Sequence, residues 1–244
     1  MLPVDLSIIV PAFNEEKLLG ETLQRIRSAI SGLLKMDWSI ELIVCDNNST
    51  DRTAELARQA GALVTFEPVN QIGRARNTGA RAAQGRWLLF IDADSRPSPE
   101  LFADLALTLQ DGRCLAGGST LCLDEPHLIA GAVTAGWNWW SRLSRWAPGT
   151  FIFCDAAVFR ELGGFDEQLY AAEEIDLFRR LKTRARELNR TIVILHRYPL
   201  VTSARKMALY TPREHLRFLV RTVLGRGRTL RDPRQCFTWY DGRR

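Results

Sequence analysis

The chain has 244 residues, of which 46% are hydrophobic and 25% are charged, and its formal net charge is +5. This composition is typical of a soluble globular protein with one large domain or two small ones. The longest apolar runs, such as 6–10 and 87–91, are far shorter than the roughly 20 residues that a membrane-spanning helix needs. We therefore expect no such helix. No basic segment leads into an apolar stretch at the N-terminus, so we also expect no signal peptide.

The cysteines indicate the redox compartment of the protein, and the basic residues indicate its possible partners. Five cysteines are scattered along the chain and none has the C-x-x-C spacing, which argues against a disulfide framework and against a zinc site. A reducing cytoplasm is therefore expected. Much of the positive charge lies late in the chain, in residues 219–235. This positive charge would suit nucleic acid, anionic lipid or a phosphorylated ligand, and it does not distinguish among these partners.

Short apolar runs alternate with amphipathic stretches along the first half of the chain. The apolar runs predict strands, and the stretches in which apolar residues recur every three or four positions predict helices. We expect Ser49 or Thr50 to cap the second helix. This alternation predicts an α/β fold with a mostly parallel sheet covered by helices on both faces. In chain order, the expected elements are strand 6–10, helix 16–34, strand 41–45, helix 50–59, strand 63–66, a helix near 73–83 and strand 87–91.

Three polar clusters stand where expected strands end. They read PAFNEE after the first strand, DNNSTD after the second and DADS after strand 87–91. A turn explains any one of them, but ligands of parallel sheets bind beyond the carboxyl ends of strands, so three clusters there predict one site. Asp92 and Asp94 point to the same side because a strand alternates its side chains. Two converging carboxylates favour a cation between them.

Glycine-rich phosphate loops are missing from this edge. Neither G-x-G-x-x-G after the first strand nor G-x-x-x-x-G-K-[ST] occurs, so glycines are not expected to hold phosphates here. A divalent cation is the other means by which a protein binds phosphates. The hard carboxylate oxygens of Asp92 and Asp94 suit Mn²⁺ or Mg²⁺, which share substrate phosphate oxygens. One of these ions is the expected cofactor.

Five blocks of sequence follow one another: VPAFNEE, DNNSTDRT, GRARNTGARAAQG, LLFIDADS, and FRELGGFDE with AEEIDLFRRL. In this order and spacing they resemble family-2 glycosyltransferases with the GT-A fold, over roughly residues 4–188. The resemblance implies a single GT-A (Rossmann-like) domain. We expect its parts to be a nucleotide-sugar-binding half at 1–123, an acceptor-binding and catalytic half at 124–210, and a basic C-terminal helix and tail at 211–244.

The resemblance also implies which residues bind the donor. Asp46 would hydrogen-bond the base, or else form an Asx turn that caps the next helix. Asp92 and Asp94 match the D-x-D motif of the family, in which the first carboxylate approaches the ribose and the second the metal, and both are expected metal ligands. Arg76 would lie beside the nucleotide or on the helix surface. The other residues implied to contact the donor are Pro11, Ala12, Glu15, Asn77 and Ala93.

Two cations near the end of the resemblance are further candidates. Arg205 and Lys206 follow an expected strand at 200–202. They would hold the diphosphate as it leaves, or else form part of a solvated basic face.

The fifth block carries an acidic pair, which reads Glu173-Glu174 where the family usually has Glu-Asp. Glu174 shares a helix face with the apolar residues at 177, 178 and 181. Asp176 is expected to form an ordinary surface pair with the arginines at 179 and 180. Glu174 is therefore the expected general base, which takes the proton of the acceptor hydroxyl. The alternative is that Glu174 only caps the start of the helix.

Residues 136–146, GWNWWSRLSRW, concentrate four tryptophans. On a helix Trp139 and Trp146 would share one face. Three interpretations stay open: core packing, a stacking wall for a sugar acceptor, or an interfacial element that contacts lipid headgroups with Arg142 and Arg145 at its edge.

Together these features predict a non-processive inverting glycosyltransferase of hexosyltransferase type that depends on a divalent metal. It would move a sugar from a nucleotide diphosphate sugar to the hydroxyl of a sugar or lipid-linked acceptor. The Q-x-x-R-W signature of processive synthases is missing. We expect a cytoplasmic protein, and leave open attachment to an anionic surface at the inner face of the membrane.

Other functions are the alternatives. One is a nucleotidyltransferase, and another is a catalytically silent relative that binds a sugar nucleotide or a membrane surface and regulates a partner. A nucleic-acid partner is not expected, since it would leave the carboxylates unexplained.

Overall fold

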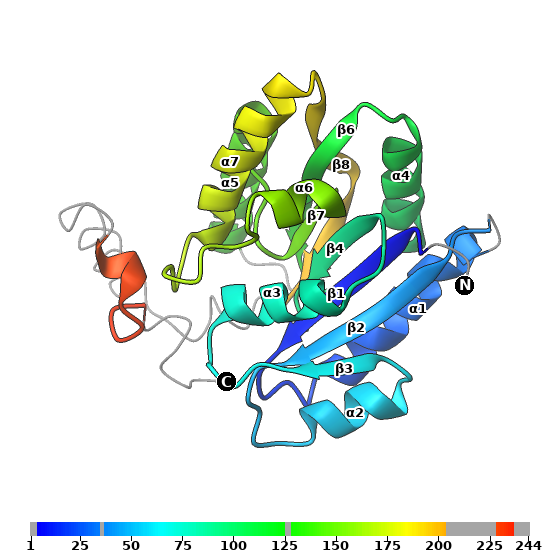
Figure 1. Ribbon diagram of the computed structural model, residues 1–244, viewed down its shortest axis with the longest axis vertical. Helices are drawn as coiled ribbons and strands as arrows, with labels where there is room; N and C mark the ends of the chain where they lie inside the picture. Colours follow the sequence, from blue (N-terminus) through cyan, green and yellow to red (C-terminus); the bar gives the residue numbers. More distant parts are fainter. Residues whose placement is uncertain (1–3, 35–36, 125–127, 204–227, 237–244) are drawn as a thin grey trace.

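The computed structural model describes residues 4–34, 37–124, 128–203 and 228–236. Within these ranges one eight-stranded sheet runs through the molecule in the order β3-β2-β1-β4-β7-β6-β8-β5 (Figure 1). The strands are β1 Leu6–Ala12, β2 Ile40–Asp46, β3 Leu63–Phe66, β4 Trp87–Ile91, β5 Ser95–Arg96, β6 Cys114–Leu123, β7 Phe151–Asp155 and β8 Thr191–Thr202. The helices are α1 Leu19–Leu34, α2 Thr53–Gln59, α3 Ile72–Ala82, α4 Pro99–Gln110, α5 Leu128–Ser144, α6 Ala156–Glu161, α7 Glu173–Glu187 and the 3₁₀ helix η1 Arg228–Arg231.

The sheet has a parallel half and a mixed half. Strand β1 pairs in parallel with both β2 and β4, and β2 pairs in parallel with β3, so these four strands end at one edge. The direction reverses at β7, which is antiparallel to β4 and to β6, while β6 and β8 are parallel. The expected mostly parallel α/β sheet is therefore confirmed.

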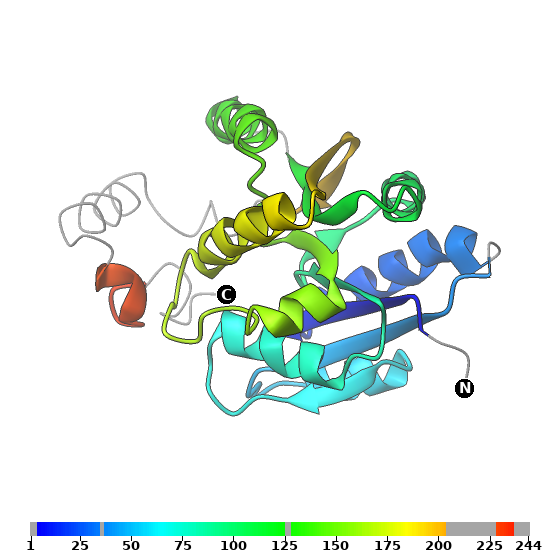
Figure 2. The same ribbon diagram turned by 45° about the horizontal axis from the view of Figure 1, so that its top comes forward.

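Helices cover both faces of the sheet because its central strands are apolar on both sides (Figure 2). On one face Ile8 and Leu89 pack in a cluster with residues of α1 and α4. On the other face Ile9 and Phe90 pack with Phe178 of α7 and with residues of α3 and α6. Neighbouring residues of one strand thus point into different core layers, as the alternation of a strand requires.

The expected elements agree with the structure at the strands and differ at helix starts. Strands 63–66 and 87–91 are confirmed to the residue, and the first strand runs two residues further, to Ala12. The cap expected at Ser49 or Thr50 is wrong, since α2 begins at Thr53 behind Arg52, whose side chain makes no capping hydrogen bond. The Ser49 hydroxyl instead accepts a hydrogen bond from the backbone N–H of Asn14 at 3.0 Å.

Candidate active site

The two polar clusters after β1 and β2 are joined to each other. The backbone N–H of Glu15 donates to Thr53 Oγ1 at 2.9 Å, and the N–H of Thr50 donates to the side-chain oxygen of Asn14 at 2.8 Å. In the ladder Ala12 stands opposite Asp46. The structure therefore brings Pro11, Ala12, Glu15 and Asp46 to one edge of the sheet, and all four are buried.

Asp46 ends β2 and forms a local turn. Its Oδ1 accepts a hydrogen bond from the backbone N–H of Ser49 at 3.1 Å. This local turn is of the kind that the sequence leaves open as an alternative, although the bonded N–H lies three residues on and not two. The turn does not cap α2, because that helix begins only at Thr53.

Arg76 of α3 is the centre of the site. It is 1% exposed, and its guanidinium binds Asp92 Oδ1 at 3.0 Å and Glu173 Oε1 at 2.6 Å. It also donates to the carbonyl oxygen of Gly149 at 2.9 Å and lies over the ring of Phe165, 5.2 Å from its centroid. The alternative expectation, a position on the helix surface, is therefore wrong. Figure 1 shows why: α3 lies against the sheet and faces the start of α7.

The buried arginine needs both of its carboxylates. Burial alone lowers the pKa of Arg76, but Asp92 and then Glu173 outweigh it, so the pKa lies above the usual value. Removing one member of such a buried network leaves an uncompensated charge, which typically costs about 3–5 kcal/mol. The guanidinium thus fixes the D-x-D carboxylate of the first half against the acidic pair of the second half.

A second contact joins the same two halves beside Arg76. The side-chain amide of Asn77 donates to the carbonyl oxygen of Phe165 and accepts from its backbone N–H, both at 2.9 Å. The preceding residue, Gly164, has φ +73°, and a Cβ there would lie 2.5 Å from Asn77 Oδ1. The GG of FRELGGFDE is thus needed for this turn. The turn places Phe165 under the guanidinium of Arg76.

The acidic pair opens α7, directly after Ala172, whose φ is +62°. The expected burial of Leu177, Phe178 and Leu181 is confirmed. Glu173 is the more buried carboxylate, at 4% exposure, whereas Glu174 is half-buried. Sequence reasoning missed Glu173, although its spacing of four and eight residues to Leu177 and Leu181 places it on the same apolar stripe.

Glu174 has an electrostatic setting unlike that of a surface carboxylate. Burial and then the charge of Glu173 raise the pKa of Glu174 to about 8, against the opposing effects of a backbone hydrogen bond and Arg76. Such a carboxyl can take up a proton near neutral pH. Asp176 differs, because it pairs with Arg179 at 3.0 Å and with Arg180 at 2.7 Å, as predicted.

The carboxylates of the D-x-D motif suit a divalent cation that is shared with a ligand. Asp92, Ala93 and Asp94 are all buried just after β4, and one oxygen of Asp92 faces Arg76. Within the described ranges no group of three or more His, Cys, Asp or Glu side chains is placed to hold a metal. Mg²⁺ is often bound by one or two carboxylates together with substrate phosphates and water. The two aspartates fit that pattern.

Two expectations concern residues elsewhere in the chain. Arg205 and Lys206 lie outside the described residues. The expected shared face of Trp139 and Trp146 is wrong, because α5 ends at Ser144 and Arg145 has φ +54°. In the described part of the chain no helix is long and apolar enough to cross a membrane.

The comparison with known families shows which family the chain belongs to. The model of the family described as glycosyl transferase family 2 matches residues 7–156. This chain belongs to that family. The match contains the first four sequence blocks, and with them Arg76 and both aspartates of the D-x-D motif.

Relatives and solved structures agree with this assignment. The chain is 29% identical over 145 residues to a dolichol-phosphate mannosyltransferase of Pyrococcus furiosus, which is 56% of this chain and 37% of that protein. Residues 1–349 of Staphylococcus aureus TarS superpose with a TM-score of 0.62 at 21% identity, over 89% of this chain and 64% of that one. Glucosyl-3-phosphoglycerate synthase of Mycobacterium tuberculosis, solved with Mn²⁺, UDP and glucosyl-3-phosphoglycerate, gives 0.58 at 22% identity, over 91% and 80%.

These similarities show the GT-A fold, and the family model shows the family. The chain spans 30–38% of the length of the first curated relatives that it matches.

Proposed function

We propose that the chain is a non-processive inverting glycosyltransferase of hexosyltransferase type, which moves a sugar from a nucleotide diphosphate sugar to an acceptor hydroxyl. The observation that carries the proposal is the buried bridge in which Arg76 holds Asp92 and Glu173 together. It sets the D-x-D motif of the donor half beside an acidic pair whose second member, Glu174, has a raised pKa. A transferase needs these two functions side by side.

In the proposed reaction the acceptor oxygen forms a bond to the anomeric carbon while the bond from that carbon to the diphosphate oxygen breaks. The diphosphate leaves with the electron pair, and the acceptor proton passes to Glu174. Attack opposite the leaving group inverts the anomeric centre. The raised pKa of Glu174 makes it a stronger base than an ordinary carboxylate, and Glu173 is paired with Arg76.

The donor would lie along the edge formed by β1, β2 and β4. We propose that Asp46 binds the base and that Asp92, held by Arg76, faces the ribose. Asp94 and Asp92 would hold Mn²⁺ or Mg²⁺, which when bound offsets the negative charge of the diphosphate. The glucosyl-3-phosphoglycerate synthase solved with Mn²⁺ and UDP supports this choice of metal and a uridine nucleotide. The other residues proposed for the donor are Pro11, Ala12, Glu15, Ala93, Arg205 and Lys206.

The acceptor would bind on the side of α7. We retain the division into a donor half at 1–123 and an acceptor half at 124–210, with a basic tail at 211–244. The mannosyltransferase relative carries dolichol phosphate in its name, which supports a lipid-linked acceptor.

The test is release of UDP from a panel of UDP-sugars by the purified chain, with Mn²⁺ and with EDTA. We expect slow, metal-dependent release, and loss of metal-dependent donor binding in Asp94→Asn when binding is measured by calorimetry. Asp104→Asn, an aspartate on α4, is the matched control. Equal nucleotide affinity of Asp94→Asn and the native chain in Mn²⁺ would contradict the metal site. No release from any UDP-sugar, with donor binding intact, would favour the catalytically silent alternative.

A further inference from the structure

Helix α5 packs with its polar side inward. The side chain of Asn138 donates to the carbonyl oxygen of Leu121 at 2.8 Å and accepts from its backbone N–H at 2.9 Å, so it pairs with an edge of β6. Ser141 is fully buried, and its hydroxyl donates to the carbonyl oxygen of Trp146 at 2.5 Å. These hydrogen bonds fix which face of the helix meets the protein.

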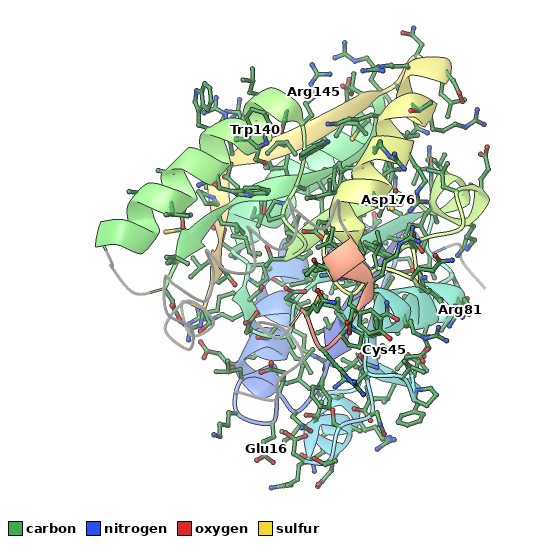
Figure 3. All side chains as sticks on the ribbon, turned by 90° about the vertical axis from the view of Figure 1, so that its left-hand side faces the viewer. Glu16, Cys45, Arg81, Trp140, Arg145 and Asp176 are labelled. Carbon is green, nitrogen blue, oxygen red and sulfur yellow. The ribbon has the colours of Figure 1, made fainter. Side chains whose placement is uncertain are left out.

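The opposite face of α5 is apolar and exposed. Val133, Trp139, Trp140 and Leu143 are 58%, 66%, 46% and 66% exposed. With about 3.6 residues per turn, these four lie within an arc of roughly 120°. The centre of this arc is nearly opposite Asn138 and Ser141. In Figure 3 Trp140 lies on α5 toward the outside of the molecule.

This is the reverse of an ordinary surface helix, which turns its apolar stripe to the core and its polar side to water. Contiguous exposed apolar residues of this kind mark a surface that contacts something else. We call these four residues the α5 face.

Charge identifies the chemistry of the partner. The sequence from 126 to 154 contains no Asp or Glu, while Arg142 and Arg145 are both exposed. On the neighbouring α7, Lys182 lies over the ring of Trp146, 4.5 Å from its centroid, and donates to the carbonyl oxygen of Ser144 at 2.5 Å. The end of the α5 face is therefore bordered by cations. Figure 3 shows Arg145 close to the end of α5.

Tryptophans beside arginines suit the headgroup region of an anionic bilayer, because the indole ring is amphipathic and the cations attract acidic lipid. A second copy of the chain suits the α5 face less well. In a symmetric dimer through this face, residues 126–154 of the second copy would offer no carboxylate to pair with the arginines.

We propose that the α5 face, with Arg142 and Arg145 at its edge, docks on the surface of an anionic membrane. The docking does not rest on the proposed transfer reaction, although it would bring a lipid-linked acceptor toward the second half of the chain. Lipid binding and sugar transfer can accordingly fail separately.

The experiment is co-sedimentation of the full chain with vesicles of phosphatidylcholine alone, or of phosphatidylcholine mixed with phosphatidylglycerol. We expect binding only to the mixed vesicles, weakened by salt. Trp139→Ala with Trp140→Ala should lower the partition coefficient at least tenfold. Arg142→Gln and Arg145→Gln should each lower it about fivefold, since each removes one surface cation.

Matched controls lie on distant, exposed parts of the sheet edge and α2. Phe66→Ala removes an aromatic ring that is 57% exposed, and Arg58→Gln removes an exposed cation. Both should bind mixed vesicles like the native chain. The tryptophan double variant should keep its melting temperature and its rate of UDP release in solution, which separates docking from folding and from catalysis.

Three results would overturn the proposal. One is the absence of binding to mixed vesicles, and another is equal binding to both kinds of vesicle. The third is a concentration-dependent dimer in sedimentation velocity that the tryptophan double variant abolishes while vesicle binding stays unchanged. That outcome would assign the α5 face to a second copy of the chain.

Discussion

Helices α5 and α7 place their side chains in opposite ways. Helix α7 carries a carboxylate, Glu173, into the interior, where the buried Arg76 compensates it. Helix α5 carries Trp139 and Trp140 to the surface, where 66% and 46% of their area is exposed. Both helices depart from the usual sorting of polar and apolar groups. In α7 the buried carboxylate finds its cation within the fold. In α5 the exposed tryptophans need a partner outside the fold. We therefore expect changes in the first region to alter stability and catalysis, and changes in the second to alter binding.

The largest effect on stability is expected when the cation that pairs with the two buried carboxylates is removed. Arg76→Met leaves Asp92 and Glu173 buried without their cation, so the free energy of unfolding should fall by about 3–5 kcal/mol. Urea unfolding measures this. Arg74→Met is the matched control on the same helix, because Arg74 pairs with Glu67 and Glu167 but is one-third exposed. It should cost about 1 kcal/mol or less. Equal losses in the two variants would contradict the view that Arg76 organises the site.

The next effect concerns the second carboxylate of the pair. Glu174→Gln removes the proposed base and keeps the shape of the side chain, so sugar transfer should fall at least about 100-fold while metal-dependent donor binding stays. Single-turnover transfer and calorimetry measure the two quantities. Asp176→Asn, two residues away and paired with Arg179 and Arg180, should keep most activity. A near-native rate of Glu174→Gln, or a dead but folded Asp176→Asn, would contradict the mechanism.

The pH dependence follows from the raised pKa of Glu174, which is about 8. A base must be deprotonated to act, so the transfer rate should rise with pH up to about 8 and level off above it. The rate profile of Asp176→Asn should be the same. A flat profile between pH 6 and about 8 would show that another group takes the proton.

The same shift has a consequence for stability. The pKa of Glu174 is higher in the folded than in the unfolded chain, so the folded state binds more protons between the two values and loses stability as pH rises through them. Glu174→Gln lacks this term, so its stability should fall less than that of the native chain between about pH 5 and 8. Urea unfolding across that range tests the difference. Parallel curves would mean that Glu174 does not titrate as described.

The smallest effect is expected on the α5 face. Trp139→Ala should change the free energy of unfolding by about 0.5 kcal/mol or less, because the side chain is mostly exposed. Phe178→Ala in α7 removes a fully buried ring and should cost about 3–5 kcal/mol. Thermal unfolding of both variants measures the contrast. A large loss for Trp139→Ala would return the tryptophans to the core-packing interpretation.

The sequence predicts what is local and repeated. Strands 63–66 and 87–91 follow from apolar runs, and the pairs of Asp176 follow from spacings of three and four residues on a helix. The five blocks also predict the fold and the family. All of these depend on neighbours within one element or on an ordered set of motifs.

The rest depends on residues that are far apart in the chain. Arg76 looks like a helix-surface cation because its two carboxylates come from the segment after β4 and from the start of α7, and no local periodicity predicts these contacts. Ser49 stands where a helix cap is expected from local sequence. Its hydroxyl instead pairs with the backbone N–H of Asn14, which is 35 residues away and cannot be found from local sequence. The end of α5 at Arg145 depends on a left-handed backbone conformation that an arginine seldom adopts.

The bridge from Arg76 to Glu173 spans 97 residues, and that from Asn77 to Phe165 spans 88. Contacts of such separation form late in folding, because a long loop must close before they can stabilise the chain. During synthesis, which proceeds from the N-terminus, the segment with Arg76 emerges well before Glu173 exists to pair with it. The nascent first half therefore holds a guanidinium without one of its two carboxylates until the second half arrives. Glu173→Gln should accordingly lower the yield of folded protein in cells, because the buried guanidinium then never gains its second carboxylate.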